Sequence, residues 1–380
     1  MRSPNPRSAA PNSVLGYVPE LDGLRGVAIL LVLASHTPLS AVVPFGGSGV
    51  DLFFVLSGYL ITSILLKSKG SPAYVRNFYI RRGLRIWPLY AVLLVFCYAI
   101  AARFIPALGF APDSYPWYWY ALYLQNFAIR DPGPIELSVT WSLAIEEQFY
   151  LVWPWVVRRL SARQLTLLLI GMVVAAPVCR AIAAYALGLP QRFAYALTFC
   201  RMDAIAAGAL IATLKEAWPT SRADVEAVAS RAVVLLPLAW GLSYFPAFRS
   251  SSLTFVVMNS LTPIGYAGLL SVVLSNHFGR LNRWLSASAL RYTGKISYGL
   301  YIYHMIVFTL LHAYFRPWLG SIVSWPTSAI LVTKWLVALP AIAVIASVSW
   351  ILFERPILGL KARFGEAALA EHDAVADAQG

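Results

Sequence analysis

The sequence predicts an all-α fold, a polytopic membrane helix bundle of about ten transmembrane helices with both termini in the cytoplasm. Three observations lead to this prediction. First, 59% of the 380 residues are hydrophobic and 12% are charged, about half the charged fraction of a soluble domain. Second, long apolar segments recur along the whole chain. Third, the basic residues are concentrated in alternate loops between these segments, as in membrane proteins of fixed orientation.

Ten apolar segments have lengths typical of membrane helices, if flanking side chains of the shortest ones reach toward the interface. They are residues 26–43, 50–66, 86–104, 138–157, 165–187, 194–214, 233–245, 255–275, 296–315 and 328–353. We expect residues 117–129, which are rich in aromatic side chains, to be re-entrant or to lie on the outer surface. We also expect a cytoplasmic tail over residues 1–17, a transmembrane domain over 18–360 and a short cytoplasmic tail over 361–380.

The loops determine the predicted orientation. With ten crossings and the N-terminus inside, 21 of the 30 basic residues lie in cytoplasmic segments and four lie in outside loops. This excess follows the positive-inside rule, whereas an eleventh crossing at residues 117–129 would remove it. The net charge of +13 therefore indicates a lipid bilayer as a partner, and we expect no nucleic acid.

Cysteine and histidine usage excludes several classes of site. The three cysteines lie in separate apolar segments, and the five histidines are scattered along the chain. Neither set has the spacing of a disulfide framework or a metal centre, so we expect no metal. The sequence also contains no P-loop, no zinc-hydrolase motif and no Gly-x-Ser-x-Gly motif. An enzyme with this sequence would be neither a metalloenzyme nor a conventional serine hydrolase.

Residues 21–36, LDGLRGVAILLVLASH, contain the most informative pair of ionisable side chains. Arg25 and His36 are eleven residues apart, which on a helix is close to three turns and roughly 16 Å. They would therefore lie on one stripe of the first helix. Ionisable groups inside membrane helices are costly and usually functional. The alternative interpretation is that Arg25 is a cytoplasmic flanking charge and His36 an interfacial histidine.

Acidic side chains occur in two of the other segments. Asp51 begins the second helix, where it either caps the helix or orients the imidazole of His36, as a carboxylate orients a general base. Glu146 and Glu147 are adjacent in the fourth helix and 100° apart, so at least one of them faces the bundle interior. Tyr150 shares a helix face with each glutamate. A structural ion pair with a nearby arginine is the alternative for this pair.

The segment FYIRRGLRIWPLY, residues 78–90, places three arginines at the cytoplasmic entrance to the third helix: Arg81, Arg82 and Arg85. One interpretation is that they are positive-inside anchors. The other is an anion site for a phosphate-bearing cytosolic ligand, because guanidinium groups bind phosphate through paired, charge-assisted hydrogen bonds.

Two later helices add four polar side chains. Arg201 and Asp203 are two residues apart and do not face each other on a helix, so each needs a partner on another element. Tyr301 and His304 lie on one face of the ninth helix. An aromatic belt at the membrane interface explains the tyrosine, but it does not explain the histidine.

Taken together, seven segments resemble, in the same order, the acyltransferase 3 family of bacterial integral-membrane O-acyltransferases. They cover roughly residues 18–360 and are LDGLRGVAILLVLASH, GVDLFFVLSGYLIT, FYIRRGLRIWPLY, WSLAIEEQFYLVWP, RMDAIAAG, KISYGLYIYH and FERP. The resemblance implies a ten-helix bundle in the bacterial cytoplasmic (inner) membrane. Such a bundle transfers an acyl group, often acetyl, from acyl-coenzyme A to a hydroxyl of a carbohydrate or glycosylated acceptor. Acyl-coenzyme A is then a co-substrate, and no cofactor is permanently bound.

The resemblance and the polar side chains lead to one hypothesis for the site. The phosphates of acyl-coenzyme A would be held by Arg25, Arg81, Arg82 and Arg85. The general base would be His36, oriented or charge-balanced by Asp51, Glu146 or Glu147. The acceptor or the transfer pathway would be lined by Tyr150, Arg201, Asp203, Tyr301 and His304.

Two other classes of function stay open at this stage. A transporter or flippase for a polysaccharide precursor or an acyl donor would also line a polar pathway with charged groups, without acyl-transfer chemistry. A scaffold subunit of a polysaccharide assembly complex is the third class. The two glutamates in the middle of the fourth helix argue against a scaffold, because packing alone does not require them.

Overall fold

The computed structural model describes residues 17–105, 108, 116–128, 135–218, 222–245, 251–276, 278–323 and 327–362. Over these residues the regular structure is helical, and no strand occurs. The N-terminal tail and most of the C-terminal tail in the predicted domain division lie outside the described residues.

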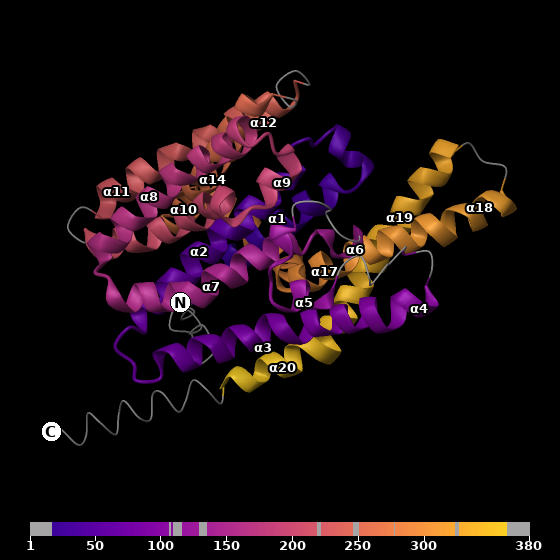
Figure 1. The fold of residues 1–380 in the computed structure, drawn as a ribbon, viewed down its shortest axis with the longest axis horizontal. Helices are drawn as coiled ribbons and strands as arrows, with labels where there is room; N and C mark the ends of the chain where they lie inside the picture. Colours follow the sequence, from indigo (N-terminus) through magenta and orange to yellow (C-terminus); the bar gives the residue numbers. More distant parts are fainter. Residues whose placement is uncertain are drawn as a thin grey trace, which may run out of the picture.

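The long helices form the body of the molecule (Figure 1). They are α1 (Pro19–Ser35), α2 (Gly49–Lys67), α3 (Tyr74–Val95), α7 (Trp141–Arg159), α8 (Ala162–Ala181), α10 (Thr198–Ala217), α14 (Ser252–Leu274), α17 (Ser297–Leu310) and α19 (Thr327–Ser349). α10 packs most extensively against α2 and α8, and α17 packs against α19. α17 also contacts α1 and α3, so it closes the space between the first and third helices.

Shorter helices connect or extend the long ones. They are α4 (Ala102–Phe104), α5 (Trp117–Ala121), α6 (Ile135–Ser138), α9 (Gln191–Ala196), α11 (Arg222–Arg231), α12 (Leu235–Ser243), α15 (Gly279–Leu285), α16 (Ser288–Lys295), α18 (Arg316–Ile322) and α20 (Arg355–Gly359). Short 3₁₀ or π-helical stretches are η1 (Pro38–Ala41), η2 (Gly46–Ser48), η3 (Phe96–Ala101), η6 (Gln125–Phe127), η7 (Ile182–Ala186), η8 (Ala232–Val234), η9 (Leu311–Phe315), η10 (Trp350–Glu354) and η11 (Leu360–Ala362). Four of these, η3, η7, η9 and η10, continue α3, α8, α17 and α19 as π-helical turns.

Six helical stretches within the described residues are long and apolar enough to cross a membrane. They are Gly46–Lys67, Tyr74–Phe104, Ala162–Ala186, Glu226–Ser243, Ser252–Leu274 and Val332–Gly359. A seventh crossing is formed if α16 and the continuous helix Ser297–Ile322, bent by 69° at their junction, are one span. Three other helices are not among these stretches. α1, with 17 residues, is shorter than each of them, and α7 and α10 carry several charged side chains. The structure therefore supports a multi-pass helical membrane protein.

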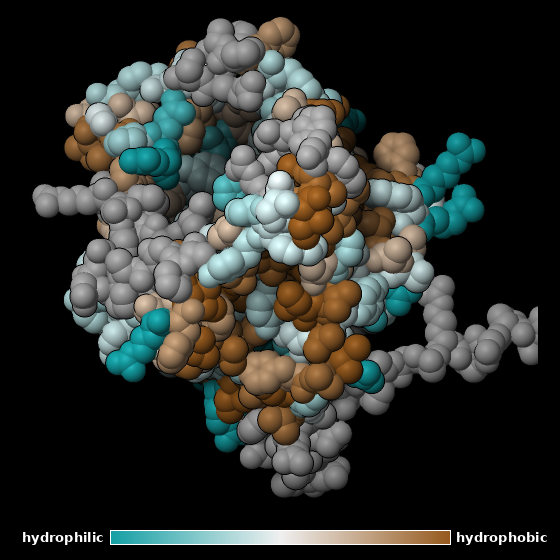
Figure 2. All heavy atoms as spheres, turned by 90° about the vertical axis from the view of Figure 1, so that its right-hand side faces the viewer, coloured by the Kyte–Doolittle hydropathy of each residue, from teal (hydrophilic) through white to brown (hydrophobic). Residues whose placement is uncertain are grey.

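Large hydrophobic side chains cover the outside of the bundle. Leu151, Val174, Leu336 and Leu352 expose 66%, 62%, 69% and 73% of their surface. Hydrophobic residues also cover much of the face seen in Figure 2, which looks onto the ends of α4, α12 and α18. Soluble monomers rarely expose contiguous apolar surface on this scale, so the exterior is suited to contact with lipid.

The predicted first helix, residues 26–43, is wrong at both ends. α1 begins at Pro19 and ends at Ser35, and His36 follows as its C-cap. The residue before a proline is disfavoured in the helical conformation, and Thr37, which precedes Pro38, is extended with a ψ angle of 171°. His36 therefore lies at the end of the helix, where its ring is less constrained by the neighbouring turns.

The predicted basic loop before the third helix is also wrong. α3 begins at Tyr74, so the three arginines of this stretch lie on a helix. Tyr74, Phe78 and Ile86 are buried at helical spacing, and this apolar face holds the stretch against the bundle. The arginines thereby take fixed directions relative to the helices that α3 contacts.

The aromatic stretch after α3 does not form a spanning helix, in agreement with the prediction for residues 117–129. α5 has five residues, and the chain turns back at Tyr123, which has a positive φ of 54°. Asn126 is buried, and the Gln148 side-chain amide on α7 donates to the Tyr123 carbonyl (2.7 Å) and to Asn126 Oδ1 (2.9 Å). The described part of this segment, residues 116–128, is thus folded against α7.

Glycines bring pairs of helices into backbone contact. A Cβ atom built at Gly58 would overlap the Ile205 carbonyl, and one built at Gly208 would overlap the Val55 carbonyl. Small side chains allow membrane helices to approach this closely. The same arrangement joins α1 to α16, where a Cβ at Gly294 would overlap the Asp22 carbonyl.

We predict that Gly208→Ala lowers the free energy of unfolding by about 1–3 kcal/mol, because the added methyl group has no space between α2 and α10. Gly171→Ala is the matched control, since this glycine of α8 has open space around it and alanine favours helices. Unfolding of both variants in a denaturing detergent titration measures the difference. Equal stability of the two variants would show that the helix contact is not rigid.

Candidate active site

Three helices direct charged side chains into one inner cavity of about 110 Å³. Its charged lining residues are Arg25 of α1, Arg82 and Arg85 of α3, and Glu146 of α7. Tyr150 and Tyr301 also line it and are buried, with 3% and 7% of their surfaces exposed. Three cations against one carboxylate leave this cavity with a positive balance, which suits an anionic ligand.

Tyr150 connects the cations of this cavity to α2. The guanidinium carbon of Arg82 lies 5.3 Å from the centre of the Tyr150 ring, within the range of a cation–π interaction. The Tyr150 hydroxyl forms a short hydrogen bond with the Ser57 hydroxyl. Arg25 forms an ion pair with Asp22 one turn earlier on α1 (2.8 Å). Arg81 is not part of the lining, so the structure separates it from Arg82 and Arg85.

The two adjacent glutamates of α7 have different surroundings. Glu146 lines the inner cavity, next to Ser57, Tyr150 and Arg82. Glu147 instead accepts a hydrogen bond from the Trp87 indole N–H of α3 (3.0 Å). The structure therefore places Glu146 with the cations, and it places Glu147 at the packing contact between α7 and α3.

His36 lines a second, outer cavity of about 500 Å³. The other polar lining residues are Gln125, Asn126, Ser138, Gln191, Arg192, Tyr195 and Asn259. The volume is within the usual range for small-molecule sites. Amide and hydroxyl side chains donate and accept hydrogen bonds equally well, so this cavity suits a neutral, hydroxyl-rich ligand better than the inner cavity does.

The hydrogen bonds of His36 determine which ring nitrogen is available. His36 Nδ1 lies 2.9 Å from the Val32 carbonyl oxygen and 3.1 Å from the Ser35 hydroxyl. A carbonyl oxygen only accepts, so Nδ1 carries the proton and Nε2 presents a lone pair. This is the tautomer that a general base requires. The backbone carbonyl of Val32 thus takes the orienting role expected of Asp51, whose carboxylate is bound elsewhere.

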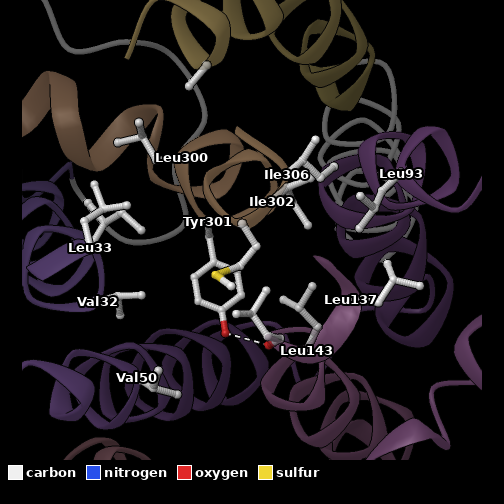
Figure 3. Packing of buried hydrophobic residues seen from close by; sticks show 14 of the residues in the cluster. Val32, Leu33, Val50, Leu93, Leu137, Leu143, Leu300, Tyr301, Ile302 and Ile306 are labelled. Carbon is white, nitrogen blue, oxygen red and sulfur yellow. Dashed lines mark hydrogen bonds between the residues drawn. The ribbon is translucent and has the colours of Figure 1, made fainter. Parts of the chain in front are cut away.

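Tyr301 and Ser142 separate the two cavities. The Tyr301 hydroxyl donates to the Val139 carbonyl (2.7 Å) and accepts from the Ser142 hydroxyl (2.7 Å). Ser142 and Tyr301 line the inner cavity, whereas Val139 and Trp141 line the outer one. Figure 3 shows Tyr301 pointing from α17 toward the start of α7. One layer of side chains therefore lies between the two cavities.

His304 lies beside this layer and next to His36. Its Nδ1 is 2.7 Å from the Tyr301 carbonyl, and the centres of the two imidazole rings are 5.0 Å apart. His304 is fully buried, and its Nε2 has no hydrogen-bond partner among the described residues. The predicted face of α17 with Tyr301 and His304 therefore lies at the boundary between the cavities.

Arg201 and Asp203 have their partners on other helices, as their spacing predicts. Arg201 forms an ion pair with Asp51 of α2 and donates to Asn259 Oδ1 of α14 (2.7 Å). Asp203 pairs with Arg180 of α8 (2.7 Å). The sequence-based reasoning did not single out Arg180. Buried charges in a bilayer are paired. Asp51 and Asp203 therefore need two cations. Since Arg201 is only one of them, the sequence indicates that a second cation such as Arg180 must be buried nearby.

We predict that Asp51→Asn costs about 3–5 kcal/mol of stability, because it leaves the Arg201 guanidinium buried without its counter-ion. The double variant Asp51→Leu, Arg201→Met should recover a large part of that loss, since it removes both charges. Asp224→Asn, at an exposed acid of α11, is the control and should change little. A double variant no more stable than Asp51→Asn would contradict the assignment of the pair. Unfolding in detergent provides the measurement.

Lys361 is a cation near this site that the sequence-based reasoning treated as a flanking charge. It lies in η11, which packs against α3 together with α20 (Figure 1). Partial burial, and then the charges of Arg85, Arg82, Arg81 and Arg25, lower the pKa of Lys361 to about 6. Lys361 therefore shares the electrostatic environment of the inner cavity, and Arg81 joins that cationic cluster at its edge.

Among the described residues, no three His, Cys, Asp or Glu side chains are grouped so that they could hold a metal ion. The three cysteines are unpaired.

Comparisons with known proteins identify the family of this chain and several relatives. Residues 18–354 match the family model of the acyltransferase 3 family, described as an acyltransferase domain. Peptidoglycan O-acetyltransferase OatA of Listeria monocytogenes is 32% identical over 322 residues, covering 77% of this chain and 50% of that protein. O-acetyltransferase OatA of Staphylococcus aureus is 28% identical over 373 residues, covering 90% and 57%. No solved structure matches the chain.

The chain thus spans about half the length of the relatives that it matches. The matched region contains the segments that form both cavities, from Arg25 of α1 to Tyr301 of α17. Because the family model covers most of the sequence, the chain belongs to the acyltransferase 3 family of membrane acyltransferase domains.

Proposed function

We propose that this protein transfers an acetyl group from acetyl-coenzyme A to a hydroxyl group of a carbohydrate across the layer between its two cavities. One observation carries the proposal. A cationic cavity and a cavity that contains a histidine base border one hydrogen-bonded group, in which Tyr301 and Ser142 line the first cavity and Val139 lines the second. The names of the relatives, which are O-acetyltransferases and in one case specify peptidoglycan, support acetyl as the group and carbohydrate as the acceptor class.

The inner cavity is the proposed donor site. Coenzyme A carries several phosphates, and Arg25, Arg82 and Arg85 offer charge-assisted hydrogen bonds to them, with Arg81 and Lys361 at the edge. The long pantetheine arm can then extend toward Tyr301 and bring the thioester to the layer. Phosphate binding would place the largest charge of the donor at the cytoplasmic end, where water and the cations stabilise it.

The outer cavity is the proposed acceptor site. His36 Nε2 removes the proton from the acceptor hydroxyl while the hydroxyl oxygen attacks the thioester carbonyl carbon. The C–S bond then breaks, and the departing thiolate takes the proton from the His36 imidazolium. The products are an acetate ester and free coenzyme A, with no net change in protons. The His304 ring, whose centre is 5.0 Å from that of His36, packs against the imidazole.

The proposed topology has ten crossings. They are the six apolar stretches, the bent pair α16–α17, and α1, α7 and α10. α1 and α7 carry Arg25 and Glu146 of the inner cavity, and α10 carries Arg201, so these three helices combine apolar surface with charged groups. Lys361 lies beside the cations at the start of α1 and α3, so the two ends of the described chain are on the same side. The positive-inside rule assigns that side to the cytoplasm of a bacterial cell.

We predict that His36→Ala lowers the rate of acetyl transfer by about 10²–10⁴-fold, the usual contribution of a general base. Purified protein, labelled acetyl-coenzyme A and a carbohydrate acceptor provide the assay, with the released thiol as a second readout. His312→Ala is the control, because His312 is exposed on η9. Full activity of His36→Ala would exclude the base assignment. Wild-type protein that releases no thiol would favour a transporter.

The pH dependence of donor binding tests the cationic cluster. Lys361 is mostly neutral at pH 7 because its pKa is about 6. A bound phosphate would raise this pKa, so binding takes up a proton. We therefore expect the dissociation constant of coenzyme A to increase as the pH rises above 6. The other charges near Lys361 belong to Arg25, Arg81, Arg82 and Arg85.

Lys361→Arg is the matched variant, because arginine stays charged at all of these pH values. Coenzyme A phosphates also titrate near pH 6, but they contribute equally to both proteins. Calorimetry gives the dissociation constant of coenzyme A for both proteins between pH 6 and 8. The difference between the two pH profiles is the contribution of Lys361. Identical pH profiles would contradict its place in the donor site.

A further inference from the structure

A third cavity adjoins the outer cavity on the side away from His36. Its volume is about 210 Å³, and we refer to it as the side cavity. It shares four lining residues with the outer cavity: Gln191, Tyr195, Phe255 and Asn259. The two cavities are therefore adjacent, and a ligand bound beside His36 would lie next to the side cavity.

The lining of the side cavity has the composition of a sugar-binding site. Phe45 and Trp240 stack with ring centres 4.4 Å apart and planes 14° apart, and they form one aromatic wall. The hydroxyl side chains Ser243, Thr254 and Thr262 and the Asp51 carboxylate are also part of the lining. Sugar rings present apolar C–H faces, which pack on aromatic rings, and edges of hydroxyl groups, which need hydrogen-bonding partners.

Hydrogen bonds from other elements hold this wall in place. The Tyr244 hydroxyl donates to the Val42 carbonyl (2.9 Å), which ties the end of α12 to the turn after η1. The Ser48 hydroxyl bonds to the Tyr266 hydroxyl of α14 (2.8 Å). The side cavity is thus built before a ligand arrives, and pre-organised sites lose less entropy on binding.

A cavity elsewhere in the molecule shows the contrast. The cavity between α8, α10, α11 and α14 is about 500 Å³ and is lined almost entirely by Val, Leu, Ile and Ala side chains. Such a lining suits a hydrocarbon chain. The side cavity instead combines aromatic rings with hydroxyl, amide and carboxylate groups, a lining that suits a sugar better than a lipid tail.

We propose that the side cavity is a second acceptor subsite that binds the sugar unit next to the one that is acetylated. The inference rests on the proposed function and narrows its acceptor to a glycan of at least two linked sugars. The shared residues Tyr195 and Asn259 would lie at the glycosidic linkage between the two units. Asn259 is already fixed there by its hydrogen bond with Arg201.

The test measures the binding of N-acetylglucosamine and its β-1,4-linked oligomers of two to four units to the purified chain by calorimetry. We expect the second unit to lower the dissociation constant about tenfold, the effect of a few good contacts. Trp240→Ala, which removes half of the aromatic wall, should abolish this gain. Met258→Trp, which fills the side cavity from α14, should abolish it without removing a wall residue, while Trp240→Phe should retain most of it.

Trp284→Ala is the control, since Trp284 is 55% exposed on α15 and lines neither the outer cavity nor the side cavity. This variant should keep the full gain in affinity from the second sugar unit. Equal or undetectable binding of the one-unit and two-unit sugars, or an unchanged gain in both Trp240→Ala and Met258→Trp, would overturn the subsite.

Transfer of labelled acetyl separates this inference from the proposed function. A chain that binds the oligomers with the expected gain but acetylates none of them overturns the transferase proposal and keeps the subsite. A chain that acetylates one-unit and two-unit sugars with equal KM overturns the subsite and keeps the transferase proposal.

Discussion

The ion pair between Asp51 and Arg201 is the interaction on which the arrangement of the outer half depends. An unpaired charge within a bilayer is costly, so α2 and α10 must keep these two groups together. Gly58 and Gly208 allow the two backbones to come close enough. Arg201 also binds Asn259 of α14. The pair therefore fixes three helices at the point where the outer and side cavities meet.

The second constraint is the separation of donor and acceptor. α1 carries Arg25 to the inner cavity and His36 to the outer cavity, at about the 16 Å spacing of eleven helical residues. A charged donor cannot cross this distance through an apolar interior, but a thin thioester arm can approach the layer of Tyr301 and Ser142. In the proposed mechanism the phosphates stay among the cations, and only the acetyl group changes sides.

Sequence reasoning identified the charged side chains that line the inner cavity, but only His36 among the residues that line the outer cavity, and it did so for a physical reason. Charged and polar residues are rare in membrane helices, so Arg25, Asp51 and Arg201 stood out against their apolar neighbours. The method failed where partners had to be chosen. The sequence suggested Asp51 as the group that orients His36. In the structure Asp51 forms an ion pair with Arg201, and the Val32 carbonyl orients His36.

Helix ends were a further weakness of the sequence reasoning. A basic stretch of α3 was expected to be a loop because its charges suggested solvent, although Tyr74 and Phe78 bury one face of a helix there. The importance of Lys361 was also missed. Its position beside the arginines depends on α20 and η11 folding back onto α3, a contact between residues far apart in the chain.

By itself, the sequence determined that this is a helical membrane protein, which end of each apolar segment is basic, and which side chains are too polar for lipid contact. These properties depend on composition and local spacing. Only the tertiary structure decided that Glu146 rather than Glu147 faces the cations, and that Tyr301 stands between two cavities. Such choices depend on the rotation of one helix against another, which distant contacts determine and local sequence does not.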